Sequence, residues 1–535
     1  MSTAAPAAPT ATTATTSAAG TSPRPGTPGE GRAGAREWLG LAVLALGALI
    51  TSIDVSVVLL ALPRIAEDLH ADSAEQLWIV DLYGFLLAGL LITFGSFADR
   101  FGRRRMVMIG AAVFAAASVL AAFAPTAGVL IIARGLCGVG AAALTPALYG
   151  LLSALFRSDR QRSVAIGVFM ACFMGGMIVG PLVGGALLAH LPWGSIFLLG
   201  VPVMILLLVL CPILLRETQR TSPAGPTDWW SVLLSLLAIL PFVCGVKELA
   251  RSGLQPASGG TIVMGVIFAV WFIRRQRRLG MDALRRPLLD LTMFRSRGFT
   301  LVLLSLMLMT LLTGPLMMLN TQYFQLIAGA GPVQAGLLTV PAALVSMLGF
   351  IVMPVIGRRV RPGIVIGAGL LLIALALILM AQVTPQTGPW PLVAGFALVS
   401  FGAAPLPTLG TTIIVGLVPL EKASSAASIS ETSGQLGYAL GIGLLGSLVT
   451  LVYRLGLPAE SALTAGQQEA VRESLAGVQT VTPHLSPELA VRVHAAAAQA
   501  FCSGIQMVSL IAAVAMAVLG VVCLIRLRHL GAFGK

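Results

Sequence analysis

The chain has little charge, few histidines and no phosphate-binding loop. Asp, Glu, Lys and Arg make up 10% of its 535 residues, whereas soluble domains carry about 25%. No GxxxxGK[ST] segment occurs, which argues against direct use of ATP. The five histidines lie in loops or at the ends of apolar runs. We therefore expect no enzymatic activity and no cofactor.

Cysteine is also scarce, and the six residues are scattered through the apolar runs. None forms a CxxC pair or a cluster with histidine. This pattern indicates neither a disulfide framework nor a metal site. We interpret the cysteines as packing residues. They are Cys137, Cys172, Cys211, Cys244, Cys502 and Cys523.

Long apolar runs are what the sequence has in abundance. Hydrophobic residues make up 57% of the chain, and a run of about 20 such residues spans a bilayer as a helix. Fourteen runs reach this length, which predicts an all-α membrane protein with 14 transmembrane helices. The predicted spans are 38–60, 77–97, 106–124, 128–152, 163–189, 195–215, 229–249, 259–275, 299–327, 334–356, 364–383, 390–417, 425–454 and 503–525.

The basic residues lie mainly on one side of these spans. The side that holds both termini and every second loop carries 27 of the 34 Lys and Arg residues. Positive residues stay in the cytoplasm, so a multi-pass protein of the cell membrane with both termini in the cytoplasm is predicted. The net charge of +13 is explained by this orientation, and no nucleic-acid partner is expected.

The chain divides into four predicted parts. Residues 1–37 are rich in Ala, Thr, Pro, Ser and Gly, which predicts a disordered cytoplasmic tail. Residues 38–215 form a first six-helix bundle, 216–298 two inserted helices with a basic loop, and 299–535 a second six-helix bundle. The turns GSFADRFGRRR and PVIGRRVRPG are weakly alike, which favours repeats about an axis normal to the membrane. The long outer loop 455–502 is either a flexible connector or a lid.

Three predicted helices each carry a carboxylate: Asp54, Asp81 and Glu431. A charge at mid-bilayer costs about 2.5–3.5 kcal/mol on insertion scales, so such residues usually face a bundle interior or a wet cavity. A buried carboxyl group holds a proton readily, and an approaching cation displaces it. That competition permits proton/cation exchange. The alternative is that each acid only hydrogen-bonds a neighbouring helix.

Three further features of the sequence involve arginine, glycine and aspartate. Arg134 lies within the fourth span and requires a partner, either an acid or backbone carbonyls. Gly176, Gly180 and Gly184 recur every four residues, which predicts close helix packing and a hinge or seal between the halves. Asp99 stands among arginines in the turn 95–105, which indicates specific pairing, because topology alone requires no acid.

In these motifs the chain resembles the major facilitator superfamily, and within it the fourteen-helix drug:proton antiporters. GSFADRFGRRR at 95–105, LIIARGLCGVGAA at 130–142 and GGMIVGPLVGG at 175–185 are similar to motifs of that family. IDVSVVLLALP at 53–63 and WIVDLYGFLLAG at 78–89 resemble the first two helices of exporters of quaternary ammonium compounds. The resemblance covers about residues 38–525.

The resemblance implies the major facilitator fold and export of lipophilic cations by alternating access, driven by protons. Asp54, Asp81 and Glu431 would bind protons and cations, and Arg134 would aid proton coupling. A conformational latch would comprise Gly95, Asp99, Arg100, Gly102, Arg103 and Arg104. The antiporter motif would comprise Gly176, Gly180, Pro181, Gly184 and Gly185.

Candidate cavity residues follow from substrate chemistry, because aromatic faces attract cations. They are Tyr83, Tyr149, Phe173, Asn320, Tyr323, Gln325, Gln435 and Tyr438. The span 334–356 has no acid, so mainly monovalent cations are expected. The expected partners are small lipophilic cations, protons and the bilayer, and a monomer is expected. The alternatives are a dedicated exporter of one natural product or antibiotic, or a proton-linked uptake permease.

Overall fold

A computed structural model describes residues 34–71, 73–156, 158–215, 217, 228–252, 256–281, 287–419, 422–457, 463–473 and 475–527. Within these residues the chain is helical and no strand is found. Fourteen helices are long and apolar enough to cross a membrane. The prediction of an all-α membrane protein with 14 spans is therefore confirmed. Of the predicted tail over 1–37, residues 1–33 lie outside the described residues. The first helix begins within its last part, at Ala35.

The first bundle contains six spans, the last of which is divided into two helices. Leu199 joins its two parts, α6 and α7. Arg36 binds the far end of this span, donating to the carbonyls of Ile213 and Leu214. The elements are α1 (Ala35–Asp68), α2 (Ser73–Phe101), α3 (Arg103–Ala122), α4 (Ala127–Leu155), α5 (Asp159–His190), α6 (Ser195–Leu198) and α7 (Gly200–Leu214).

The second bundle follows two inserted helices, α8 (Trp229–Ser252) and α9 (Pro256–Met281). Its first span is interrupted at Gly314 and Pro315, because proline lacks the N–H that continues a helix. The elements are η1 (Leu291–Arg295), α10 (Arg297–Thr313), α11 (Leu316–Leu326), α12 (Pro332–Ile356), α13 (Pro362–Met380), α14 (Trp390–Ala403), η2 (Leu406–Gly410), α15 (Thr411–Gly416), α16 (Ala423–Gly456) and α19 (Pro487–Arg526).

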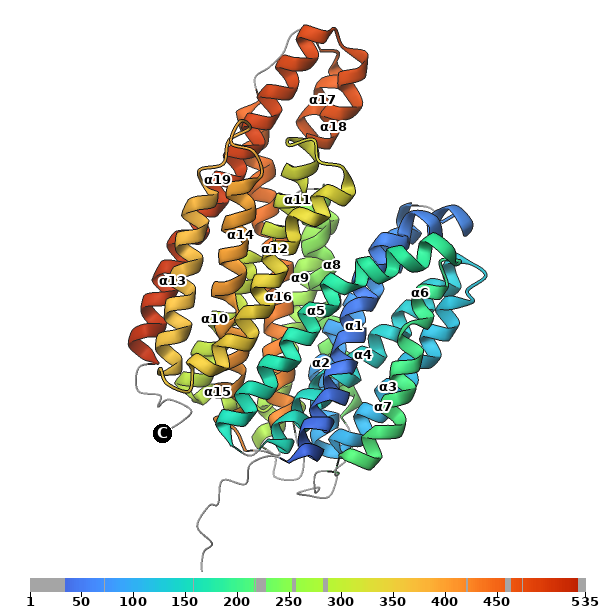
Figure 1. Cartoon of the computed structure of the whole chain (residues 1–535), viewed down its shortest axis with the longest axis vertical. Helices are drawn as coiled ribbons and strands as arrows, with labels where there is room; N and C mark the ends of the chain where they lie inside the picture. The colour runs from blue at the N-terminus through green and yellow to red at the C-terminus, as the bar shows by residue number, and fades with distance from the viewer. Residues whose placement is uncertain are drawn as a thin grey trace, which may run out of the picture.

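The two bundles meet at one end and diverge at the other (Figure 1). They meet where α2 ends and α16 begins, which we call the basic end because its loops carry most of the arginines. There a Cβ on Gly167 of α5 would lie 2.6 Å from the Pro354 ring of α12. The opposite end is where α1 ends and α2 begins. The ribbons therefore indicate a conformation closed at the basic end.

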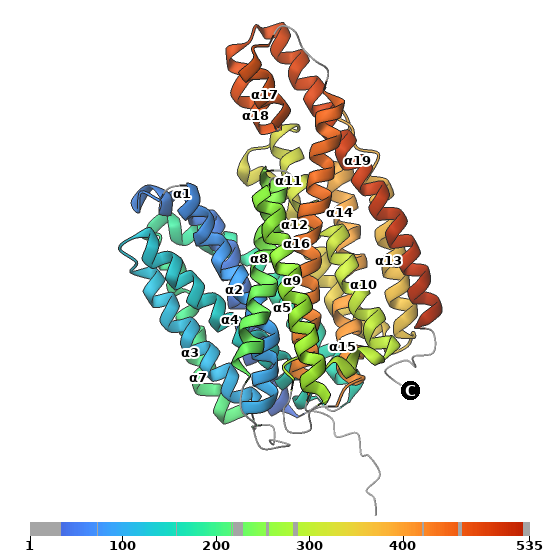
Figure 2. The same ribbon diagram turned by 180° about the vertical axis from the view of Figure 1, so that it is seen from behind.

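The inserted helices lie between the two bundles at the back of the molecule (Figure 2). α8 packs against α2 of the first bundle and α16 of the second. Phe85, Val243 and Ala439, one from each of these helices, share a small buried cluster. Larger hydrophobic cores lie within each bundle. α8 thus covers the seam between α2 and α16.

The described residues of the segment 455–502 are largely helical and pack against the second bundle. α17 (Ala465–Glu473) and α18 (Leu475–Val481) pack beside α19, which begins at Pro487, well before the predicted span start at 503. Val471, Val478 and Val493 are buried in a common core. The Tyr453 hydroxyl donates to the Val471 carbonyl at 2.8 Å. With these helices the second bundle projects beyond the end of the first bundle (Figure 1).

Candidate transport site

Asp54 of α1 and Arg134 of α4 form a buried ion pair. Arg134 Nη1 lies 2.6 Å from Asp54 Oδ2, and the two side chains are 2% and 8% exposed. Arg134 Nε also donates to the Ile79 carbonyl of α2 at 3.2 Å. Both kinds of partner that the sequence left open for Arg134, an acid and a backbone carbonyl, are therefore present.

Aromatic rings enclose the same guanidinium. The centroid of the Tyr83 ring lies 4.6 Å from Arg134 Cζ, and that of Phe197 lies 6.0 Å away. Cations are attracted to such ring faces. Tyr83 is itself buried. The structure therefore places Tyr83, predicted for the substrate cavity, under Arg134, where it supports the Asp54–Arg134 pair.

Glu431 of α16 has a different environment. Its Oε1 accepts a hydrogen bond from Gln435 Nε2 at 3.1 Å, and it acts electrostatically on Tyr149 of α4. Among the described residues, no lysine or arginine pairs with it. Its negative charge is therefore not neutralised by the described part of the protein.

Tyr149 and its neighbours form an adaptable surface near this acid. The Tyr149 ring packs on Phe169 of α5 at a centroid distance of 5.0 Å, and its hydroxyl lies 3.5 Å from Met170 Sδ. Met170 packs against the cores of both bundles. Flexible methionine side chains fit varied shapes. The Glu431 region therefore combines charge, aromatic faces and plasticity at the junction of the bundles.

The three predicted acids do not form one cluster. Asp81 precedes Asp99 by 18 residues on α2, which is about 27 Å along the helix. Glu431 follows Ser424, the residue beside Asp99, by seven residues, or about 10 Å. Within the described residues, no group of three or more His, Cys, Asp and Glu side chains is arranged so that it could hold a metal ion. Asp81 and Glu431 therefore lie at different depths.

Asp99 joins the two bundles at the basic end. Its carboxylate accepts hydrogen bonds from the backbone N–H of Ser424 at 3.2 Å and of Ser425 at 2.7 Å, and from the Ser425 hydroxyl at 2.8 Å. These donors belong to the first turn of α16. An acid here satisfies free N–H groups and complements the helix dipole. Asp99 therefore caps a helix of the opposite bundle.

Arg103 of the same turn holds Asp99 in place. Arg103 donates to Asp99 Oδ1 at 3.0 Å and to the Gly150 carbonyl of α4 at 3.0 Å, and it is buried. The Arg104 N–H donates to Glu217 at 3.2 Å, and the Arg100 guanidinium lies 5.9 Å from the Phe101 ring. Among the predicted latch residues, Arg103 therefore binds Asp99 directly, whereas Arg104 contacts Glu217 and Arg100 contacts Phe101.

Backbone conformation and close packing explain why glycine occupies two positions of this turn. Gly102 has φ +108° at the start of α3, a backbone conformation that side chains disfavour. A Cβ on Gly95 would lie 2.6 Å from Ser428 Cβ. Gly95 therefore permits the close approach of α2 to α16 that brings Asp99 to its serine partners.

The glycine stripe of α5 packs against α1. A Cβ on Gly176 would lie 2.6 Å from the Leu49 carbonyl oxygen, and one on Gly184 would lie 2.7 Å from Val57 Cγ1. Gly180 similarly faces Ser56. Gly185 has more room, since the nearest atom to its Cβ would be 3.8 Å away. α5 continues unbroken through Pro181, and the Pro181 side chain lies outside the described set.

The remaining predicted cavity residues are dispersed. Tyr323 is buried and donates to the carbonyls of Thr384 and Gly388, a packing contact. Asn320 is buried, and neither of its side-chain polar atoms has a hydrogen-bond partner among the described residues. Gln325 is exposed. Phe173 is half-buried beside the first bundle's core, and Tyr438 is half-exposed on α16.

Several functional contacts were not foreseen from the sequence. Ser424 and Ser425 bind Asp99. The sequence did contain a signal for the start of this helix, because serine is favoured at helix N-termini. Lys422 bonds Asp290 just before the same helix. Asp228 pairs with Arg275 between α8 and α9. These partners come from segments far apart in sequence, so spacing alone gave no indication of them.

Fourteen apolar spans in two bundles that meet around buried charges are the architecture of a multi-pass membrane transporter. A model of the Major Facilitator Superfamily matches residues 44–442. The chain therefore belongs to the Major Facilitator Superfamily, as its motifs predicted. The crystal structure of the human organic anion transporter MFSD10 (TETRAN) shares the fold, with a TM-score of 0.56, 16% identity, and coverage of 90% of this chain and 99% of that one.

Curated relatives extend over nearly the whole chain. The multidrug efflux pump LfrA of Mycolicibacterium smegmatis is 38% identical over 500 residues, covering 93% of this chain and 98% of LfrA. The methyl viologen resistance protein SmvA of Salmonella typhimurium is 30% identical and covers 87% and 93%. The puromycin resistance protein pur8 of Streptomyces alboniger is 32% identical and covers 78% and 82%.

Proposed function

We propose that this protein is a proton-coupled antiporter that exports lipophilic, mainly monovalent cationic drugs from the cell. The basic end faces the cytoplasm in this proposal, because positive loops stay on that side. Relatives named as efflux and resistance proteins support the export of drugs. The proton gradient supplies the energy, and small cationic molecules and protons are the partners.

The observation that carries the proposal is the environment of Glu431. It is a membrane carboxylate without a cationic partner among the described residues. It lies on α16, which packs against α4, the helix of Tyr149. A lipophilic cation would bring the missing positive charge and gain contact with the Tyr149 ring. A proton would neutralise the same carboxylate, so substrate and proton compete for it.

Asp54 has the second role in this proposal. Its carboxylate is already neutralised by Arg134 at 2.6 Å, which disfavours a further cation. A proton that reaches Asp54 removes its charge and weakens the ion pair between α1 and α4. We infer that protonation of Asp54 couples the proton gradient to movement of these helices, whereas Glu431 binds the drug.

Everted membrane vesicles from a pump-deficient host test the assignment of Glu431. With the lumen acidified, tetraphenylphosphonium should release protons from wild-type vesicles, and Glu431→Gln should abolish that release. Glu469→Gln is the matched control, since this exposed acid lies on α17 outside the membrane core. Wild-type proton release by Glu431→Gln would exclude Glu431 as the cation site.

A dedicated exporter of one antibiotic is the second candidate, favoured by the similarity to the puromycin resistance protein. A growth-inhibition panel separates the two. A broad exporter protects a pump-deficient host against several unrelated monovalent cations. Protection against a single antibiotic, with no effect on any quaternary ammonium compound, favours the dedicated exporter.

A further inference from the structure

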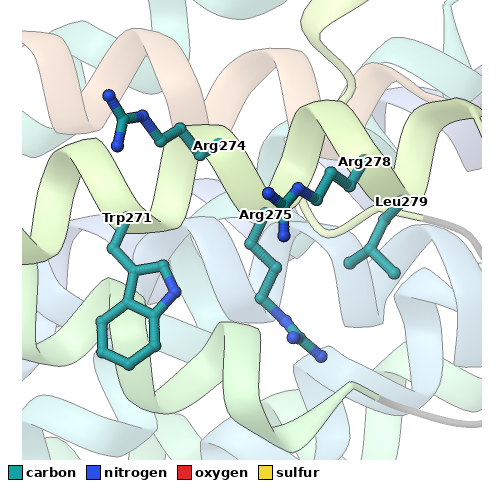
Figure 3. Close-up of a pocket in the computed structure, with 5 residues that line it drawn as sticks. All are labelled: Trp271, Arg274, Arg275, Arg278 and Leu279. Carbon is teal, nitrogen blue, oxygen red and sulfur yellow. The ribbon is translucent and has the colours of Figure 1, made fainter.

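A pocket of about 290 Å³ lies at the basic end of the inserted helix α9. Trp271, Arg274, Arg275, Arg278 and Leu279 line it. All five belong to the last turns of α9, and the Arg274 side chain extends from the opposite side of the helix to Trp271 and Leu279 (Figure 3). Figure 3 shows the Trp271 and Arg275 side chains extending from the same side of the helix, with the Arg278 guanidinium running back toward Arg275.

Hydrogen bonds to residues at the start of α8 hold one wall of this pocket in place. Arg275 makes two hydrogen bonds to the Asp228 carboxylate, at 2.8 and 2.9 Å. Asp228 also accepts from the Ser231 hydroxyl at 2.6 Å. The buried Gln276 donates to Ser231 at 2.8 Å and accepts from the Leu289 N–H at 3.2 Å. The orientation of the end of α9 is therefore fixed before any ligand binds.

Two arginines of the pocket have no acidic partner among the described residues. Asp228 satisfies Arg275, whereas neither Arg274 nor Arg278 makes an ion pair among the described residues. Both are exposed. The pocket with Asp228 therefore has two positive charges in excess, and it requires an anion rather than a drug cation.

The pocket adjoins an exposed apolar face of α9. Above it, α9 presents a row of exposed apolar side chains, and its helix packing within the described residues is essentially against α8 alone. Trp271 is 57% exposed at the junction of this row with the arginines, which is the position of tryptophan at membrane interfaces. The row comprises Val263, Met264, Val266, Ile267, Val270 and Trp271.

We propose that this pocket binds the phosphate headgroup of an anionic phospholipid. Arg274 and Arg278 donate to the phosphate oxygens, because guanidinium groups match phosphate geometry. Trp271 lies against the glycerol region, and the acyl chains follow the apolar row of α9. Basic pockets between transmembrane helices bind headgroups of this kind. The site is separate from Glu431 and takes the opposite charge.

The lipid would act on the transporter through α8. This helix packs against both α2 and α16, one from each bundle, and Thr93 of α2 lies 3.4 Å from Ser235 of α8 between their hydroxyl oxygens. A headgroup bound at α9 anchors the inserted pair to one leaflet. The bound lipid then fixes the depth of α8 and α9 in the membrane. These two helices would cover the seam between α2 and α16 at that depth.

Native mass spectrometry of the purified full-length protein tests the site. Cardiolipin or phosphatidylglycerol is titrated against wild type and Arg274→Gln/Arg278→Gln. The dissociation constant for the anionic lipid should rise about 30-fold in the variant, roughly fivefold for each charge removed. Arg277→Gln/Arg526→Gln is the control. It removes the same charge from exposed basic-end positions that do not line the pocket and should change binding less than twofold.

Three results would overturn the proposal. Equal weakening by both double variants would mean a diffuse charge effect instead of a pocket. Equally tight binding of phosphatidylcholine by the wild type would mean that the arginines do not select the lipid. Displacement of the lipid by excess inorganic phosphate would assign the pocket to a soluble anion. Unchanged melting temperatures of both variants without lipid verify that they are folded.

Discussion

The Asp54 carboxylate and the Arg134 guanidinium lie 2.6 Å apart, buried between α1 and α4. Arg134 also reaches the Ile79 carbonyl of α2 and lies on the Tyr83 ring. One arginine thus ties three helices of the first bundle together around a single acid. A change in the charge of Asp54 therefore alters the contacts that join α1, α2 and α4.

We expect Asp54→Asn to uncouple transport from protons without abolishing drug binding. The amide cannot take up a proton in the transport cycle, while Glu431 remains available to the cation. Everted vesicles should show no substrate-driven proton release, and tetraphenylphosphonium should still bind the purified variant with an affinity within a few-fold of wild type. Equal proton release by Asp54→Asn and wild type would contradict the coupling role.

Arg134→Met should destabilise the protein strongly, because it leaves the Asp54 carboxylate buried without a counter-charge. Removing one partner of a buried pair costs about 3–5 kcal/mol. Thermal unfolding in detergent measures the loss. The double variant Asp54→Asn/Arg134→Met should recover part of it, since no charge remains uncompensated. A double variant less stable than Arg134→Met would show that the ion pair is not the cause.

Asp99→Ala should loosen the basic-end contact between the bundles. It removes three hydrogen bonds to the first turn of α16, and loss of a helix cap costs about 1 kcal/mol. Hydrogen exchange at residues 423–430 should accelerate about fivefold or more. Asp99→Asn retains an acceptor oxygen and should give a smaller change. Unaltered exchange in Asp99→Ala would mean that Asp99 does not cap α16 in solution.

Glycine positions on α5 should differ sharply in their tolerance of alanine. Gly176→Ala places a methyl group 2.6 Å from the Leu49 carbonyl, so α1 and α5 must separate at a cost of about 1–3 kcal/mol. Gly175→Ala is the matched control, since nothing lies within 4 Å of its Cβ position. Melting temperature and drug efflux should both fall for Gly176→Ala and stay near wild type for Gly175→Ala.

The Asp228–Arg275 pair should stabilise the inserted helices in a pH-dependent way. Burial raises the pKa of Asp228, but hydrogen bonds from Arg275 and Ser231 lower it by more, so its pKa lies below the usual value. The stabilisation is therefore complete above the unfolded pKa of about 3.9 and is lost as pH falls through the folded pKa.

Asp228→Asn should accordingly lower the melting temperature at pH 7, and this difference from wild type should shrink below about pH 4. Thermal unfolding across this pH range in detergent measures the effect. A difference that is constant from pH 7 to pH 3 would show that the carboxylate charge does not contribute.

The sequence by itself determined the fourteen spans and the family. Apolar runs of helix length report membrane burial directly, because each helix satisfies its own backbone hydrogen bonds in lipid. Short motifs such as the turn 95–105 were readable through their resemblance to the family, and the structure adds that Gly102 there has a positive φ, which favours glycine. The segment 455–502 was harder to interpret, because its helices are stabilised by packing on α19 rather than by membrane length.

Only the tertiary structure decided which charges meet. Asp54, Asp81 and Glu431 were equivalent in sequence as single acids in apolar helices. Folding gave Asp54 an arginine and left Glu431 beside Tyr149 without a described cationic partner. It also brought Asp99 to Ser425, more than 300 positions away in the chain. Such pairings depend on how helices from distant parts of the chain pack, and local residue patterns do not encode that packing.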